Sequence, residues 1–401
     1  MTRDSNIARL SWLFFTTFSV LGGCAHRQTI SSPYPFWGEE ISLPGSAESP
    51  SLKGQFKPSY SADPAACLLL VHGMNEYIGR YGEIAAHFAP NYHVAGIDLY
   101  AHGLSNPVIA AAEARLRQGT ATADVSRAYQ AQASLRNLDL LRDNFARALH
   151  YLARRCPEKP VFILAHSLGG LVAASHFMQS GANKTSPCPI GGIVLLGPAF
   201  SVPDIPGWRG WLQNPLIQFS FFAESNFLYR GDDLLPWFLA KQIVAVPATL
   251  LLRGTFEAAS WPGMRPLTTP VTPPWVPSYL SDWEVEQARH LADGYIIRRT
   301  LPRFAKGVER EIVHFRRRME KFDLPYLLVY SGHDPITAAW GNEEFIQVTR
   351  TNHPDNQVMT LEAHSHHEHL FSSPPLRREI LRRIGEWIEK RLNKLELRQT
   401  I

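Results

Sequence analysis

Short apolar runs alternate with longer amphipathic stretches along most of the chain from residue 65 onward. Six of these runs have the length of buried parallel strands and are bounded by Gly, Pro, Asp or His. They are Cys67–Val71, His93–Ile97, Val161–Ala165, Ile193–Leu196, Tyr326–Tyr330 and Gln357–Leu361. The stretches between them contain helical patterns, so the sequence predicts an α/β fold with a mostly parallel sheet covered by helices.

An amphipathic helix is predicted near the end of the chain. Its apolar residues recur at helical spacing, with Lys and Arg between them, at Ile380, Leu381, Ile384, Trp387 and Ile388. This spacing places the apolar side chains on one face, so we expect the helix to pack against the sheet.

The N-terminus has the pattern of an export signal. Arg3 and Arg9 precede a short apolar run from Leu10 to Leu21. A run of this length is too short to cross a bilayer, which needs about 20 apolar residues. It is typical of a signal peptide, so residues 1–23 are predicted to be removed.

The residues after this run, Leu21-Gly22-Gly23-Cys24, resemble the bacterial lipoprotein box. The resemblance implies that Cys24 becomes the lipid-bearing N-terminus, and Ala25 resembles an outer-membrane sorting signal. We therefore expect a lipid-anchored protein of the bacterial cell envelope, at the outer membrane and facing the periplasm. An ordinary secretory signal with a chance cysteine is the alternative. Residues 24–60 are rich in Ser, Pro and Gly and are predicted to be a tether with at most one edge strand.

Composition narrows the function classes. The 401 residues are 45% hydrophobic and carry a net charge of +4, which favours a globular protein and gives no reason to expect nucleic acid as a partner. Four cysteines without a Cys-x-x-Cys pair do not suggest a structural zinc site. Cys156 and Cys188 each lie five residues before a predicted strand, so we expect a Cys156–Cys188 disulfide. Cys67 lies inside a strand and is interpreted as a buried apolar residue.

The run Val161–Ala165 leads directly into His166-Ser167-Leu168-Gly169-Gly170 and then into an apolar helix. A serine on a sharp turn between a strand and a helix has the pattern of a nucleophile elbow. The turn needs small residues two positions before and after the serine, and Ala165 and Gly169 satisfy this requirement. Ser167 is therefore the candidate nucleophile.

Two further segments carry a resemblance to a family. His72-Gly73-Met74-Asn75-Glu76-Tyr77-Ile78-Gly79-Arg80-Tyr81 and Asp98-Leu99-Tyr100-Ala101-His102-Gly103-Leu104-Ser105 resemble motifs of the monoacylglycerol lipase and lysophospholipase branch of the α/β-hydrolases. Tyr77, Ala101 and Ala165 depart from its usual His and Gly. The resemblance implies an α/β-hydrolase fold with helices on both faces of the sheet. It also implies a core of residues 61–198 and 323–401, a lid at 199–322, and serine chemistry without a cofactor or metal.

Acyl transfer needs backbone N–H groups aimed at the developing oxyanion. Met74 lies in the loop after the first predicted parallel strand, and Leu168 directly follows Ser167. We expect their two backbone N–H groups to form the oxyanion hole.

A serine nucleophile also needs a histidine base and a carboxylate that orients it. Asp334 follows the predicted strand Tyr326–Tyr330, at the carboxyl edge of the sheet, and is the candidate acid. Four histidines follow the next strand, and the residues alone do not choose among them. The family pattern small-x-His-Glu-x-Leu selects His367 as the base, with His366 as runner-up and His364 and His369 behind it. A metal site is the rival explanation of this histidine cluster.

The predicted lid contains six of the ten tryptophans, and collectively such a surface suits an apolar acyl chain. The sequence thus predicts hydrolysis of a lipid-like ester, either lysophospholipid or monoacylglycerol, through an acyl-enzyme. Acyl transfer to an alcohol uses the same three residues and is one alternative. A non-catalytic envelope lipoprotein that retains the fold is the other.

Overall fold

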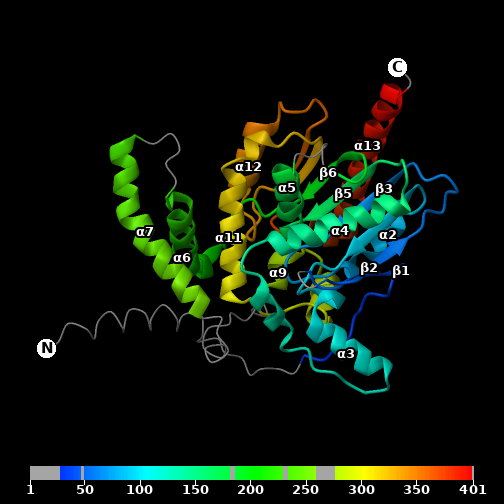
Figure 1. Cartoon of the computed structure of the whole chain (residues 1–401), viewed down its shortest axis with the longest axis horizontal. Helices are drawn as coiled ribbons and strands as arrows, with labels where there is room; N and C mark the ends of the chain where they lie inside the picture. The colour runs from blue at the N-terminus through cyan, green and yellow to red at the C-terminus, as the bar shows by residue number, and fades with distance from the viewer. Residues whose placement is uncertain (1–27, 47–48, 181–185, 229–233, 259–275, 400–401) are drawn as a thin grey trace.

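The computed structural model describes residues 28–46, 49–180, 186–228, 234–258 and 276–399. An eight-stranded sheet runs through it in the order β1-β2-β4-β3-β5-β6-β7-β8 (Figure 1). The six predicted runs form its parallel part: β3 Ala66–Val71, β4 Tyr92–Ile97, β5 Val161–His166, β6 Ile190–Leu196, β7 Tyr326–Ser331 and β8 Gln357–Leu361. The prediction of a mostly parallel sheet is confirmed.

Two further strands precede the parallel part and make the sheet mixed. β1 Glu39–Leu43 pairs antiparallel with β2 Leu52–Lys57, which pairs antiparallel with β4. The tether predicted at residues 24–60 thus contains two strands rather than at most one. Ile41 and Leu43 are buried and their neighbours are exposed, but so short an alternation between Ser, Pro and Gly residues is a weak strand signal.

The segment before β1 is also attached to the body. Ile30 N–H donates to Ala123 O at 2.9 Å, and Gln28 Nε2 donates to Ile296 O at 2.7 Å and to Gly294 O at 3.2 Å. The chain is therefore fixed to the protein from its first described residue onward.

Helices cover both faces of the sheet. α2 Gly82–Phe88 and α13 Pro374–Gln399 pack on one face, and α3 Pro107–Arg117, α4 Asp139–Arg155, α5 Leu168–Ser180 and α12 Ala339–Thr349 pack on the other. Short 3-10 turns lie at η1 Ile78–Tyr81, η2 Gly103–Ser105, η3 Ala128–Ser134, η5 Met319–Lys321 and η6 His369–Phe371. The closing helix is confirmed, because Ile380, Ile384, Trp387 and Ile388 of α13 are buried.

The disulfide differs from the prediction. Cys156 pairs with Cys67, with their Cα atoms 6.5 Å apart, and Cys188 is a free, buried cysteine. The predicted Cys156–Cys188 bond is wrong because the end of α4 lies against β3. Cys67 pairs with Val161 across β3 and β5, so Cys156, five residues before Val161, passes close to Cys67.

The predicted lid, residues 199–322, has three parts. α6 Gly207–Asn226 and α7 Leu235–Ala258 form a helical pair, called the hairpin below, and α7 lies at the outer edge of the molecule (Figure 1). Residues 276–301, called the inner segment, contain α9 Pro277–Leu280 and α10 Glu284–Ala292. The third part, α11 Pro302–Arg316, packs on the rest of the protein, and its Phe304, Ile312 and Phe315 are buried in the main apolar core.

Candidate active site

Ser167 occupies the sharp turn between β5 and α5. Its φ is +51°, in the left-handed region that L-residues rarely adopt, as expected for a serine held in a strained turn. The turn has no room for a side chain at Gly169, where a Cβ would lie 2.6 Å from His72 O. Glycine at position 169 therefore lets the start of α5 pack closely against the end of β3.

The structure brings the three predicted residues of the site together. His367 Nε2 lies 2.8 Å from Ser167 Oγ, and His367 Nδ1 lies 2.7 Å from Asp334 Oδ2. Asp334 follows β7 and His367 follows β8, so both reach the site from the carboxyl edge of the parallel strands. His367, rather than the runner-up His366, makes the contact with the serine.

The acid and the base stabilise each other's charged forms. Burial on its own raises the pKa of Asp334, but the adjacent His367 imidazole lowers it more, and the net pKa lies below the usual range. Burial lowers the pKa of His367, yet the charge and hydrogen bond of Asp334 bring its net pKa above the usual 6.5. Backbone N–H groups of Ile336 and Thr337 also donate to Asp334 Oδ1, at 2.8 and 3.0 Å. The carboxylate is thus held ionised and oriented.

The predicted oxyanion loop runs beside the serine. A Cβ on Gly73 would lie 3.1 Å from Ser167 Cβ and 2.9 Å from His166 Nδ1, so the backbone next to Met74 is close to the nucleophile. Leu168 is the first residue of α5 and follows the serine directly. The two backbone segments expected to supply oxyanion donors therefore flank Ser167.

The comparison with known families agrees with this geometry. Residues 62–371 match the Hydrolase_4 family, which is described as serine aminopeptidase, S33. The chain belongs to this family. It is a serine hydrolase with the α/β-hydrolase fold, as the motifs predict.

Solved structures similar to this hydrolase support the same fold. A soluble variant of monoglyceride lipase from Saccharomyces cerevisiae aligns with a TM-score of 0.61 at 13% identity, over 90% of this chain and 99% of that chain. A monoacylglycerol lipase from Paleococcus ferrophilus gives 0.55 at 16% identity, over 85% and 99%. A carboxyl esterase from Bacillus coagulans gives 0.56 at 16% identity, over 88% and 98%. No curated protein matches the chain significantly.

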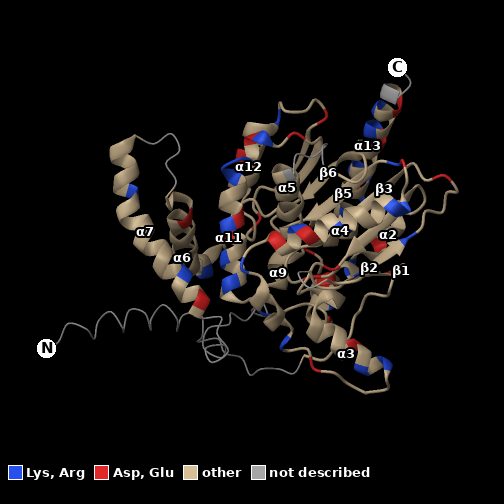
Figure 2. Cartoon of the chain, in the orientation of Figure 1, with Lys and Arg blue, Asp and Glu red and all other residues tan. Residues whose placement is uncertain are grey.

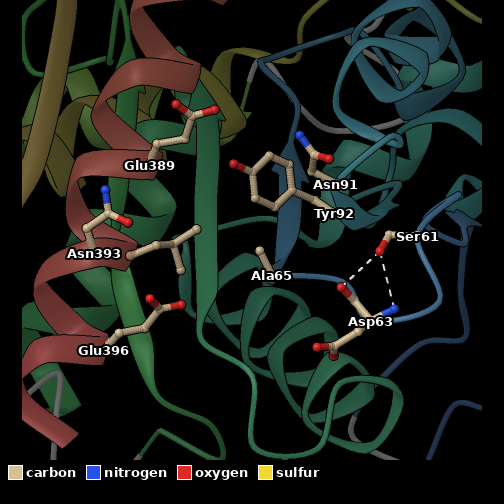
Figure 3. A pocket seen from close by; sticks show the side chains of 9 residues that line it. Ser61, Asp63, Ala65, Asn91, Tyr92, Glu389, Asn393 and Glu396 are labelled. Atoms are coloured by element: carbon tan, nitrogen blue, oxygen red, sulfur yellow. Dashed lines mark hydrogen bonds between the residues drawn. The ribbon is translucent and has the colours of Figure 1, made fainter. Parts of the chain in front are cut away.

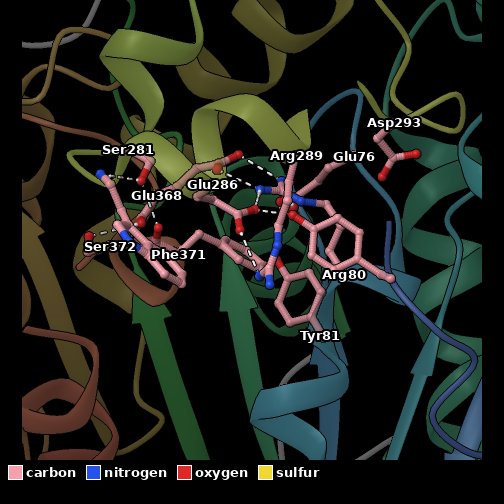
Figure 4. Close-up of polar contacts among 12 residues, drawn as sticks. Glu76, Arg80, Tyr81, Ser281, Glu286, Arg289, Asp293, Glu368, Phe371 and Ser372 are labelled. Carbon is pink, nitrogen blue, oxygen red and sulfur yellow. Dashed lines mark hydrogen bonds and ion pairs between the residues drawn. The ribbon is translucent and has the colours of Figure 1, made fainter. Parts of the chain in front are cut away.

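A buried ionic cluster, drawn in Figure 4, includes Glu368, the residue that follows His367. Arg80 is 2% exposed, and its guanidinium bonds to three carboxylates. Nη1 lies 2.8 Å from Glu76 Oε2 and 2.8 Å from Glu368 Oε1, while Nη2 lies 2.7 Å from Glu368 Oε2 and 3.0 Å from Glu286 Oε1. The two parallel bonds to Glu368 form the bidentate arrangement that favours arginine over lysine.

This cluster joins the loop that contains Gly73, the turn that contains Ser167 and the loop that contains His367. Glu76 Oε1 accepts from Gly73 N–H at 2.5 Å and lies 2.7 Å from His166 Nδ1, so it orients the predicted oxyanion loop and the residue before Ser167. Glu368 directly follows His367. Glu76 and Arg80 lie within a motif noted in the sequence, but nothing along the chain indicates that Glu286 would join them from 206 residues away.

The inner segment is bonded to the loop that carries His367. His367 N–H donates to Tyr279 O at 3.1 Å, and Glu368 N–H donates to Leu280 O at 2.7 Å. Ser281 Oγ adds a bond of 2.7 Å to Phe371 O. These bonds, together with the Glu286–Arg80 ion pair, make the inner segment part of the wall that fixes the histidine.

Two further features of the described chain bear on other kinds of site. In the described part of the chain, no group of three or more His, Cys, Asp or Glu side chains is arranged to hold a metal ion. A hollow of about 230 Å³ lies at the other end of the sheet, lined by residues that include Asp63, Tyr92, Glu389 and Glu396 (Figure 3). Tyr92 begins β4, so this hollow opens at the amino ends of the strands, opposite the serine.

Proposed function

We propose that this hydrolase is a serine-dependent carboxylic ester hydrolase that acts on lipid-like esters, namely lysophospholipids or monoacylglycerols. The observation that carries the proposal is the continuous line of hydrogen bonds from Ser167 through His367 to Asp334. A hydroxyl, an imidazole and a carboxylate in this order are the groups that nucleophilic acyl transfer requires.

The geometry gives each group a step. Ser167 Oγ attacks the ester carbonyl while His367 Nε2 takes the hydroxyl proton, and Asp334 stabilises the imidazolium that forms. The backbone N–H groups of Met74 and Leu168 receive the oxyanion. His367 then protonates the leaving alcohol, which departs and leaves an acyl group on Ser167. Water, deprotonated by His367, attacks this acyl-enzyme, and His367 then returns the proton to Ser167 Oγ as the bond to the acyl group breaks and the carboxylic acid is released.

The lipid-like substrate is supported by two observations. The similar solved structures include two described as monoglyceride lipases. The predicted lid, residues 199–322, also carries most of the large apolar side chains that the described chain leaves exposed. The family description names a peptidase, and an amide would be cleaved by the same steps, so the test compares esters with amides.

The test measures turnover of short and long fatty-acid esters, a monoacylglycerol, a lysophospholipid and an aminoacyl anilide. We expect the long lipid esters to be preferred and Ser167→Ala to lower turnover by about 10⁶-fold, as loss of a triad nucleophile does. Labelling by a fluorophosphonate should disappear in the same variant. Ser175→Ala is the matched control. Ser175 is a buried serine of α5, the helix that follows Ser167, and this variant should retain activity.

Three results would contradict parts of the proposal. Near-normal hydrolysis by Ser167→Ala would show that Ser167 is not the nucleophile. A faster reaction with the anilide would favour peptidase chemistry. Formation of a new ester when glycerol competes with water would favour the acyltransferase alternative.

We further propose that Cys24 is the lipid-modified first residue of the mature protein, which would be held at the outer membrane and face the periplasm. The support is the sequence Leu21-Gly22-Gly23-Cys24 after an apolar run of signal-peptide length. Mass spectrometry of the N-terminal peptide should show an acylated Cys24 and no residue before it. A Cys24→Ala variant should keep residues 1–23, and an unmodified mature N-terminus would contradict the proposal.

A further inference from the structure

The hairpin exposes an unusual amount of apolar surface. α7 is long and apolar enough to cross a membrane by length and composition, yet only 11% of its most apolar stretch is buried. Lys241 is the one charged residue from Leu235 to Leu252. A helix with this composition is normally buried, in a protein core or in lipid.

This exposure is concentrated in one region. Of the 19 large hydrophobic residues that are exposed in the described chain, 13 lie between Trp208 and Leu251. Trp237, Ile243 and Leu251 are examples, and each is at least 66% exposed. Single exposed apolar residues are ordinary, but a concentration of this size in one region of the chain marks an interaction surface. In Figure 2 almost all of α7 has the colour of uncharged residues, whereas the ribbon of α11 has several blue and red segments.

Polar contacts on the inner side of α7 decide between crossing a bilayer and lying on it. Arg253 forms an ion pair with Glu224 of α6, and Arg303 of α11 forms one with Glu257 at 2.5 Å. Gln242 Nε2 donates to Asn226 O at 2.6 Å. A spanning α7 would have to separate from α6 and α11, lose these contacts and carry Lys241 and Gln242 into hydrocarbon, so the helix is suited to the membrane interface.

Positive charge at the base of the hairpin suits phospholipid headgroups. A hollow of about 240 Å³ there is lined by Arg136, Arg253, Arg303, Lys306 and Arg310, with Glu257 also in its wall. Glu224 and Glu309 neutralise part of this charge from nearby. An excess of cations remains, and basic residues beside an apolar face strengthen binding to anionic lipid surfaces.

The proposed lipid on Cys24 would place the inner segment near a membrane. Gln28 is bonded to Gly294 and Ile296 of the inner segment, and it follows Cys24 by four residues. Four residues span at most about 14 Å, so a lipid on Cys24 would hold this side of the protein close to the bilayer surface.

We propose that the hairpin is a membrane-docking surface that inserts its exposed apolar face into the interface of a phospholipid bilayer, beside the N-terminal lipid anchor. The anchor argument rests on the proposed lipidation of Cys24, whereas the apolar surface and the basic hollow do not. The hairpin and the anchor would then form two separate membrane contacts, the combination that gives stable attachment.

The test uses a chain that begins at Ala25, carries Ser167→Ala and so cannot hydrolyse the lipid. It keeps every described contact, because these begin at Gln28. We expect it to float with vesicles of phosphatidylcholine containing anionic phosphatidylglycerol. The pair Ile243→Glu and Leu251→Glu should weaken binding by about 100-fold, since carboxylates on the inserted face oppose burial.

The matched control is the pair Tyr60→Glu and Leu397→Glu, which charges two similarly exposed apolar residues outside the hairpin. It should bind vesicles like the parent chain. The proposal is overturned if the parent stays in solution with vesicles, or if the hairpin and control pairs bind equally. It is also overturned if light scattering shows a dimer that the hairpin pair separates while no vesicle binding occurs, because a second copy would then cover the surface. Ester hydrolysis by the same chain with Ser167 restored is measured separately, so failure of docking and failure of the proposed activity can be told apart.

Discussion

The hairpin and the inner segment belong to one insertion but differ in how they are bound. In the inner segment, Glu286 forms an ion pair with Arg80, and backbone carbonyls accept hydrogen bonds from the His367 loop. The hairpin contacts the body mainly through α11 and exposes its apolar side chains. The predicted lid is therefore not one unit in the structure, because the inner segment contacts the candidate site while the hairpin faces the surroundings.

The largest expected difference between the two parts concerns their arginines. Arg80→Ala removes the one guanidinium that three buried carboxylates share, so we expect the free energy of unfolding to fall by about 3–5 kcal/mol. In the hairpin, Arg253→Ala should cost about 1 kcal/mol, since Arg253 is partly exposed. Glu224 also keeps Lys306 as a partner at 3.3 Å. Urea unfolding of both variants measures the difference.

Arg80→Lys sharpens the same comparison. Lysine keeps the charge but cannot bond bidentately to Glu368, so its stability should lie between those of the parent and Arg80→Ala. Equal losses for Arg80→Ala and Arg253→Ala would mean that the inner segment is no more firmly attached than the hairpin.

Much of the sheet and of the candidate site could be predicted because their signals are local. Buried parallel strands are short continuous apolar runs, and Ser167 sits in a turn that demands small neighbours at fixed positions. Asp334 was predicted from its place after a strand. His367 needed the family pattern, because four nearby histidines carry the same local signal.

The features that could not be predicted depend on distant parts of the chain. Cys67 looks like any small buried residue of a strand, and only the path of the chain after α4 brings it to Cys156. The ion pair between Glu286 and Arg80 depends on how the inner segment packs against the core, which no local pattern indicates. β1 pairs with β2, and β2 pairs with β4, and the short patterns of the two strands do not reveal this pairing.

A pH profile tests whether the hairpin is separate from the chemistry. Only neutral His367 can accept the serine proton, so kcat/KM should fall as the pH drops through the pKa of this histidine. Asp334 holds that pKa above 6.5, and the midpoint of the fall should therefore lie above pH 6.5, with about a tenfold loss per pH unit below it. The measurement uses a soluble short-chain ester.

The hairpin pair Ile243→Glu and Leu251→Glu should leave this midpoint unchanged, because neither side chain contacts the His367 loop in the described structure. Asp334→Asn should shift the midpoint downward and lower kcat by about 10⁴-fold, since it removes the charge that raises the pKa and orients the imidazole. A midpoint that moves with the hairpin charges would place the hairpin within electrostatic reach of the site. The two parts of the insertion would then have to be treated as one.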